Sequence, residues 1–389
     1  MWLAIASASY GVLSAFDPII FIYIAYTLGA SSVYMGILSA SWSTTYIVFS
    51  RVMGSLADAG RNKLLALLAL IAVIPIPLLL KNPNQITALL AYNLHALAIA
   101  MLNLSLSVSI LESFESSDWN TVNTVNRVLN NVARGFTLIA MAMLGLGVFQ
   151  QALQVLIVLM ALTLAVIPSI YMPLYRKLYM FEKTLDKVGL YVKASTSLLY
   201  LDKPKVAAEV FEKVWNSTSS VPSPAKIIVG IMGAVIVGDY IFTVIPVIMR
   251  KTLGISVMWT AYGIAAIVSA AIGIALSRIS SSSTTRKAFA VAVLRLAILS
   301  LGLGFVRDVI TLAMYIIISS ALFLMLDIIL YNAYVLARAG YGTSTYFIAR
   351  EVGSIIGSLA GGVIYSLHPN LYIYTAIALG LATALPLAI

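Results

Sequence analysis

Charged residues inside apolar segments are the part of this sequence that can do chemistry. Three aspartates, Asp17, Asp239 and Asp327, each lie within a long apolar stretch. An ionisable side chain at mid-bilayer costs about 2.5–3.5 kcal/mol on insertion scales, so its presence points to function. A carboxylate that alternates between a poorly solvated environment and the neighbourhood of a cation changes its proton affinity. We therefore expect these aspartates, Asp17 above all, to couple a proton gradient to the movement of a solute.

Two other roles for the same aspartates stay open. A static ion pair, with Arg134 or Arg350 neutralising an acid, would hold helices together without any transfer of protons. A carboxylate in a cavity can also bind a cationic group of a substrate directly. Substitution of Asp17 by asparagine tests proton coupling, because loss of uphill accumulation with retained exchange is the result expected of a coupling residue.

Arg134 is the strongest candidate for binding an anionic group of a substrate. Its planar guanidinium matches the geometry of carboxylate and phosphate, although pairing with Glu112 or Asp17 would explain the same residue. Neutral polar residues on the same or neighbouring spans could hydrogen-bond a polar solute. They are Asn103, Asn130, Tyr331 and Asn332. We expect the histidine at position 95 to form a hydrogen bond between helices rather than to relay protons.

Arg127 and Arg350 occupy matching depths in two spans and are candidate gate residues. Each lies a few residues inside the end of its span, and Glu112 and Glu351 are candidate partners. Arg295, in a span expected at the periphery, should snorkel or form a structural pair.

The composition of the chain differs from that of a soluble domain. Of its 389 residues 61% are hydrophobic and 10% charged, whereas soluble domains carry about 25% charged residues. The net charge of +10 would suggest nucleic acid in a soluble protein, but loops of membrane proteins also accumulate Lys and Arg. With no cysteine and only two histidines, neither a thiolate nor a histidine metal site is expected. We also expect no cofactor, and the absence of nucleotide and hydrolase motifs argues against an ATP-driven pump and against an intramembrane enzyme.

The apolar stretches predict twelve transmembrane helices, because each approaches the roughly 20 residues that a span requires. The expected spans are 3–28, 34–57, 64–80, 85–111, 122–149, 152–173, 226–249, 257–277, 288–304, 309–334, 343–367 and 371–388. They divide the chain into a six-helix bundle at 1–173, a linker at 174–225 and a second six-helix bundle at 226–389. With the N-terminus in the cytoplasm, cytoplasmic loops carry fifteen basic residues and the opposite loops four. This charge bias predicts a multi-pass protein of the cell membrane with both termini cytoplasmic.

The two halves read as a repeat. Gly11 precedes Asp17 by six positions, and Gly233 precedes Asp239 by the same interval. Between the second and third spans stands the segment Gly54-Ser-Leu-Ala-Asp58-Ala-Gly60-Arg61-Asn-Lys63. This loop resembles the loop motif of the major facilitator superfamily, a Gly followed by an Asp and then by Gly-Arg-x-Arg/Lys. Ala59 replaces the arginine that usually follows the aspartate.

The resemblance implies an all-α membrane protein with two pseudo-symmetric bundles and a substrate site between them. It implies a secondary active transporter that moves a small solute by alternating access, with spans one, four, seven and ten lining the cavity. Asp58 would then be a latch to span eleven in one state, with Gly60 forming the tight turn. A passive facilitator or a lipid or drug exporter of the same fold is the alternative. The expected partners are a small-molecule substrate and the lipid bilayer, with no nucleic acid, and the chain is expected to be a monomer.

Overall fold

The protein is built from helices that run side by side. The computed structural model describes residues 1–115, 118–170, 181, 185, 223–277, 284–302, 304, 306, 308–338 and 343–388. Throughout these residues the regular structure is helical, without strands. The predicted linker at 174–225 lies almost entirely outside them, so the domain boundaries stay predictions.

The first half contributes six spans. They are α1 (Trp2–Thr27), α2 (Ser32–Asp58), the pair α3 (Asn62–Val73) and α4 (Ile76–Leu79), α5 (Gln85–Ser113), α6 (Trp119–Leu144) and α7 (Phe149–Val166). A short 3-10 turn, η1 (Leu146–Val148), joins the last two. The predicted spans agree with these helices to within a few residues at most ends.

The second half repeats this arrangement. Its spans are the pair α10 (Pro224–Phe242) and α11 (Ile245–Met249), followed by α12 (Ile255–Ser277), α13 (Thr284–Gly302), α14 (Val309–Ala337), α15 (Thr343–Leu367) and α16 (Pro369–Ala388). Counted with α3–α4 and α10–α11 as broken single spans, the described residues form twelve helices, as predicted.

Local sequence explains where helices begin and break. Ser31 caps α2 by accepting a hydrogen bond from the Tyr34 amide, and Asn84 and Thr87 form a reciprocal capping box at α5. Pro75 stands at the break between α3 and α4. The α10–α11 break at Thr243 faces the interior of the protein, where irregular backbone is tolerated because it lines a cavity.

Eight helical segments of the described chain are long and apolar enough to cross a membrane by length and composition. α13 holds a shorter apolar stretch, Ala288–Leu299. Two helices outside this set, α2 and α6, carry charged and amide side chains yet pack within the bundle against α15 and α12. Several of their polar residues, such as Ser43 and Asn130, are buried inside the bundle, so a criterion based on mean hydropathy and charge count does not recognise these helices as spans.

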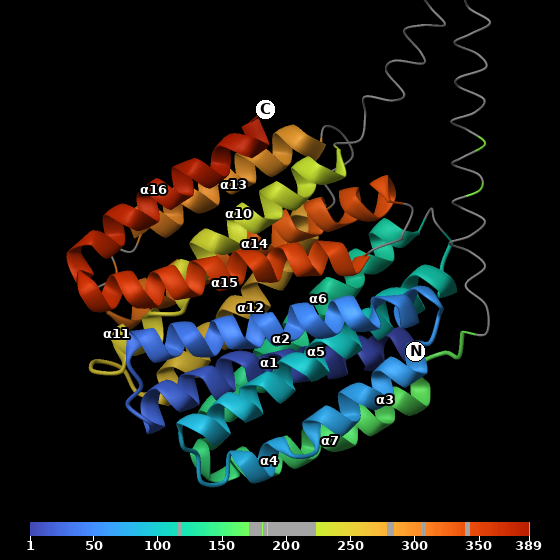
Figure 1. Ribbon diagram of the computed structural model, residues 1–389, viewed down its shortest axis with the longest axis horizontal. Coiled ribbons are helices and arrows are strands. Elements are labelled where there is room, and N and C mark those ends of the chain that lie inside the picture. The colour runs from blue at the N-terminus through green and yellow to red at the C-terminus, as the bar shows by residue number, and fades with distance from the viewer. Residues whose placement is uncertain are drawn as a thin grey trace, which may run out of the picture.

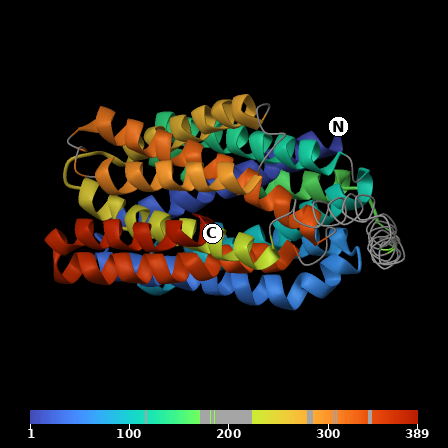
Figure 2. The same cartoon turned by 90° about the horizontal axis from the view of Figure 1, so that it is seen from above.

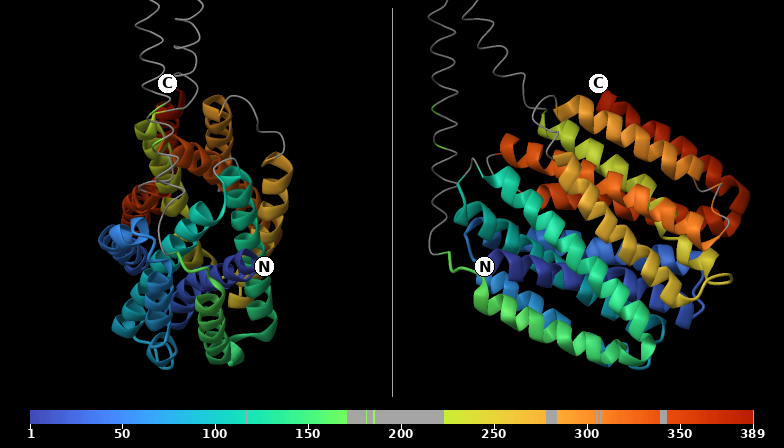
Figure 3. Two further views of the ribbon diagram at one scale, coloured as in Figure 1. Left: turned by 90° about the vertical axis from the view of Figure 1, so that its right-hand side faces the viewer. Right: turned by 180° about the vertical axis from the view of Figure 1, so that it is seen from behind.

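The halves lie against each other along two helix pairs, α2 with α15 and α6 with α12 (Figure 1). Figure 2 shows α15 running alongside α2 from a second direction. We call the end of the bundle at which α1 begins the terminal end, and the other the opposite end. Viewed from the terminal end, the first half lies below the second and helices of both surround the middle of the molecule (Figure 3, left).

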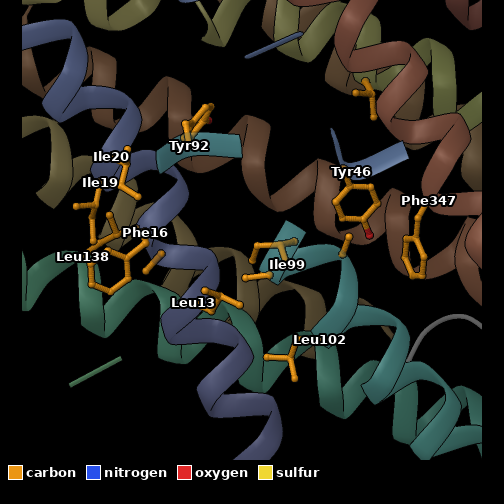
Figure 4. Packing of buried hydrophobic residues seen from close by; sticks show 14 of the residues in the cluster. Leu13, Phe16, Ile19, Ile20, Tyr46, Tyr92, Ile99, Leu102, Leu138 and Phe347 are labelled. Atoms are coloured by element: carbon orange, nitrogen blue, oxygen red, sulfur yellow. The ribbon is translucent and has the colours of Figure 1, made fainter. Parts of the chain in front are cut away.

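Apolar packing fixes the helices around this middle. Leu13 and Phe16 of α1 lie beside Leu138 of α6 in the buried cluster, and Tyr46 of α2 lies near Phe347 of α15 (Figure 4). Gly11 lets α1 approach α6 closely, because a Cβ there would collide with the backbone carbonyl of Asn130. Within the second half, Gly353, Gly357 and Gly361 make the matching contact of α15 with α10.

Candidate functional site

A cavity of about 360 Å³ lies between the two halves. This volume is at the lower end of the range of small-molecule sites, roughly 300–1,000 Å³. Helices α1, α2, α5 and α6 of the first half line it, together with α10, α12, α13, α14 and α15 of the second. Its charged lining residues are Asp17, Asp239, Asp327, Arg127, Arg134, Arg295 and Arg350. All three predicted aspartates and Arg134 are therefore brought together around one space.

The polar face of α6 supplies one wall. Arg127, Asn130, Asn131 and Arg134 all line the cavity, and their spacing of three to four residues places them on one side of the helix. The Asn130 side-chain oxygen is buried and accepts no hydrogen bond from any described residue. The predicted contacts Asn130 and Arg134 are thus positioned to meet a solute.

Asp17 is more open to the cavity than Asp327. Its carboxylate accepts a hydrogen bond of 2.6 Å from the Tyr92 hydroxyl, and it lies 4.0 Å from an Nη atom of Arg134. The two charged side chains are 38% and 33% exposed. A pair at this distance and exposure is weak, so either partner can exchange the other for a solute group.

His95 connects helices below this pair. Its Nε2 lies 2.8 Å from the Leu13 carbonyl oxygen, and its Nδ1 accepts a hydrogen bond from Trp42 Nε1 at 3.2 Å. Since the carbonyl can only accept, Nε2 carries the proton and the imidazole is neutral. The ring therefore ties α5 to α1 and α2, which confirms the predicted role as an interhelical hydrogen-bonding residue.

Asp327 has far stronger partners. Its carboxylate lies 3.3 Å from Arg127 Nη1 and 3.7 Å from Arg350 Nη1, and it accepts a hydrogen bond of 3.0 Å from the Tyr346 hydroxyl. Only 5% of its side chain is exposed. Because Arg127 belongs to α6 and Asp327 to α14, this pair joins the two halves toward the terminal end.

A second contact at the same depth reinforces the closure. Ser43 of α2 donates a hydrogen bond of 2.7 Å to Glu351 of α15, and Glu351 lies 3.8 Å from Arg350. Arg127, Arg350 and Glu351 thus belong to one network across the halves, and their role as gate residues stays a prediction.

The opposite end is closed by different chemistry. Arg250, after α11, donates a hydrogen bond of 2.7 Å to the Ala30 carbonyl and a longer one of 3.4 Å to that of Ala25. The Tyr26 hydroxyl donates to the Leu253 carbonyl at 2.9 Å. A cation at the C-terminal end of α1 is favourable because unpaired carbonyls give this end a partial negative charge. Both contacts cross from one half to the other.

Comparison with known proteins decides the family. The sequence model described as Major Facilitator Superfamily matches residues 2–358. The chain belongs to the major facilitator superfamily. It is thus a transporter by family and not an enzyme. No curated protein sequence matches the chain closely enough to count as a relative.

Solved structures of the major facilitator superfamily share the whole fold. The E. coli xylose transporter XylE, in a partially occluded inward-open conformation, matches with a TM-score of 0.68 at 12% identity, over 99% of this chain and 96% of that one. The human organic anion transporter MFSD10 gives 0.67 at 14%, over 99% and 97%. A peptide transporter in complex with alafosfalin gives 0.61 at 14%, over 98% and 93%. At these identities the similarity shows the fold alone.

Several predicted residues lie away from the cavity of this superfamily member. Asn103 is buried and donates to the Tyr46 hydroxyl at 2.8 Å. Tyr331 lies under the Arg127 guanidinium, 4.9 Å from it, and so belongs to the closure at the terminal end. Asn332 and Glu112 do not line the cavity. The predicted substrate contacts Asn103, Tyr331 and Asn332 therefore do not line the cavity in this conformation. The role of Glu112 as a gate partner stays a prediction.

The loop motif is positioned at the terminal end of α2. Gly60 has a φ of +76°, a conformation that favours glycine, and its amide donates to the Ala57 carbonyl, which closes the turn. Gly54 is buried, Asp58 is half-buried, Arg61 is exposed and Lys63 is partly exposed. A latch from Asp58 to α15 stays a prediction.

Sequence reasoning missed part of the lining. Tyr10, Trp42, Tyr92 and Tyr262 line the cavity, although none of them was predicted from the sequence to do so. Arg295 also lines it, with 5% of the residue exposed, so the expectation of snorkelling is wrong. Its structural contacts are nevertheless present, because it donates to the Ala234 carbonyl at 2.6 Å and lies 4.6 Å from the Phe323 ring.

Proposed function

We propose that this chain is a secondary active transporter that carries a small polar or charged solute through the central cavity by alternating access. The observation that carries the proposal is a charged cavity between two halves, closed at each end by contacts that cross from one half to the other. Because separate sets of contacts close the two ends, one set can break while the other holds.

The helix–helix contacts between the two halves are suited to such a motion. On one side Gly135 of α6 and Gly263 of α12 meet, and a Cβ on Gly135 would lie 2.7 Å from the Gly263 carbonyl oxygen. On the other side Gly36 of α2 packs against α15 near Ser358. Contacts without interlocking side chains allow backbones to approach closely and present little obstacle to rocking.

Proton coupling is assigned to Asp17 and Asp239 in this proposal, and Asp327 is assigned to the gate. Asp17 is exposed to the cavity and has one arginine at the limit of pairing distance, whereas Asp327 is held by two arginines and a tyrosine. A proton can reach Asp17 without breaking a closure between the halves. Neutralising Asp327 would release Arg127 from the ion pair. In this proposal the charge of Asp327 therefore controls the closing of the terminal end.

Uptake into proteoliposomes tests this function. With a proton gradient imposed, the wild type should accumulate its solute above the external concentration, and Asp17→Asn should retain exchange while losing accumulation. Asp308→Asn, in an exposed loop before α14, is the matched control. Unaltered accumulation in Asp17→Asn would remove this residue from coupling, and the absence of a gradient effect in wild type would favour the passive facilitator. Transport of lipids or drugs alone would favour the exporter alternative.

The setting in the membrane belongs to the same proposal. We propose a monomer in the cell membrane with both termini in the cytoplasm, which makes the terminal end the cytoplasmic one. The support is the excess of basic residues in the loops at that end. Single cysteines placed in the loops of this cysteine-free chain, labelled with an impermeant maleimide in intact cells, test the orientation.

A further inference from the structure

Arg295 is the cavity residue that the proposed function leaves without a role. It projects from α13 between α10 and α14, and 5% of it is exposed. One Nη nitrogen occupies the space that a side chain at position 238 would need, since a Cβ on Gly238 would lie 2.6 Å from it. Glycine at this position of α10 therefore makes room for a guanidinium at the cavity wall.

The guanidinium still has hydrogen-bonding capacity. It donates to the Ala234 carbonyl at 2.6 Å, but its buried Nε has no hydrogen-bond partner among the described residues. Ser319 of α14 also lines the cavity, and its buried hydroxyl is likewise without a partner in the described part of the chain. Ser319 lies one helical turn before Phe323, whose ring is 4.6 Å from the Arg295 guanidinium. Two unpaired donors thus lie along one stretch of cavity wall.

The charge of Arg295 is balanced only at a distance. No carboxylate of the described chain lies within the 4.0 Å that defines an ion pair with it. Asp239 follows Gly238 directly in α10 and lines the same cavity as Arg295. The other charged groups around this cavity include Asp17 on α1 and Arg350 on α15. On α14 the nearest charged lining residue is Asp327, which two other arginines already hold.

We propose that Arg295 and Ser319 form an anion subsite for a monocarboxylate substrate, and that protonation of Asp239 opens this subsite to the anion. The inference rests on the proposed transport function and names its substrate class. With Asp239 ionised, its negative charge offsets Arg295 and opposes a second anion. With Asp239 protonated, Arg295 is uncompensated and attracts one negative charge.

The proposal predicts reciprocal binding of proton and anion, since each must raise the affinity for the other by the same factor. One buried cation matches a single carboxylate, whose two oxygens can accept from Nε and from the serine hydroxyl. At about pH 8 inorganic phosphate carries a charge near −2, which exceeds what one arginine neutralises in a poorly hydrated site. Phe242, Tyr262 and Phe323 add apolar lining for the body of an organic acid.

Thermal-shift titration of the purified full-length protein tests the proposal. The probes are lactate and benzoate, each paired with its uncharged amide, lactamide and benzamide, plus inorganic phosphate. At about pH 5.5 and about pH 8 the probe acids stay ionised. The acids should stabilise the protein and the amides should not, with an affinity about tenfold higher at the lower pH, within the usual range of coupling.

Variants locate the effect. Arg295→Gln should abolish carboxylate binding. Gly238→Ala should weaken it, because the new methyl group shifts the guanidinium while the side chain keeps its charge. Ser319→Ala should weaken binding, and Asp239→Asn should bind equally tightly at both pH values. Arg51→Gln, an exposed arginine on α2, is the control that should match the wild type.

Three results would overturn the inference and leave the transport function standing. Carboxylate binding that stays at the wild-type level in both Arg295→Gln and Gly238→Ala places the anion elsewhere. Preference for phosphate or for the amides refutes the substrate class, as does the absence of any carboxylate effect on well-folded wild type. Failure of the proposed function would show instead as absence of solute flux in proteoliposomes, whichever ligand binds.

Discussion

Neutralising Asp327 should open the terminal end of the cavity. Asp327→Asn removes a carboxylate that lies within 4 Å of both Arg127 and Arg350. Arg350 keeps Glu351 at 3.8 Å, so Arg127, with 12% of its side chain exposed, loses the most. Removing one partner of a buried pair typically costs about 3–5 kcal/mol because the other charge stays buried and uncompensated.

Two features reduce that cost here. The Arg127 guanidinium also lies over the rings of Tyr331 and Phe347, at 4.9 and 5.7 Å, and each ring offsets part of the lost interaction. An asparagine oxygen can still accept one hydrogen bond. We therefore expect about 2–3 kcal/mol, which separation of the halves relieves by exposing Arg127 to water. At 1.4 kcal/mol per factor of ten, the ratio of open to closed protein should rise about 30- to 140-fold.

Cysteine accessibility measures this ratio directly, because the native chain contains no cysteine. Ser14, which lines the cavity on α1, is replaced by cysteine and labelled from the terminal end with an impermeant maleimide. Labelling should be faster in Asp327→Asn than in the Asp327 background, and Asp308→Asn should not change it. The double variant Arg127→Gln with Asp327→Asn should melt higher than Asp327→Asn alone, since both members of the pair are then gone. Unchanged labelling in a folded Asp327→Asn protein would refute the view that this ion pair closes the terminal end.

Three further predictions concern the rest of the bundle. Gly135→Val should impair solute uptake, because the new side chain would collide with the Gly263 carbonyl oxygen of α12. Gly147→Ala is the control and should leave uptake unchanged, since nothing lies within 4 Å of a Cβ at that position. Arg250→Gln should speed labelling of the Ser14→Cys probe from the opposite side, because a charged hydrogen bond worth about 1.5–3 kcal/mol to Ala30 is lost; an unchanged rate would argue against a closure there. Asp308→Ala should lower Tm at neutral pH, because Asp308 caps α14 through the Thr311 amide, and that hydrogen bond lowers the pKa of the carboxyl below its ordinary 3.8. A lowered pKa stabilises the fold above pH 3.8 and loses its effect as pH falls below it, so the difference in Tm should shrink in strong acid.

The fold was predictable because span length and loop charge are set by the membrane. Even α6, with Arg127, Asn130 and Arg134 in it, was recognisable as a helix, and its polar spacing of three to four residues already marked one face. The three aspartates were recognisable because charge is rare in an apolar span. Each of these signals is local in the sequence.

The partners of these residues were not predictable, because they depend on how helices rotate and pack. Asn103 carries the same chemistry as Asn130, but it faces Tyr46 within the first half and is already hydrogen-bonded. Arg295 belongs to a peripheral span, and only the rotation of α13 and the absence of a side chain at Gly238 bring it to the cavity. Tyr92 gained its role through a contact with Asp17, 75 positions away in the chain.

The two closures differ in what can open them. At the terminal end the halves are joined by carboxylates, Asp327 with Arg127 and Glu351 with Ser43, so a proton or a competing anion can weaken the contact. At the opposite end Arg250 and Tyr26 donate to backbone carbonyls, which neither titrate nor exchange partners with an acid. On the proposed mechanism, we expect protonation to weaken the closure at the terminal end and to leave the one at the opposite end intact. From this asymmetry we expect proton binding to favour the state that is open at the terminal end.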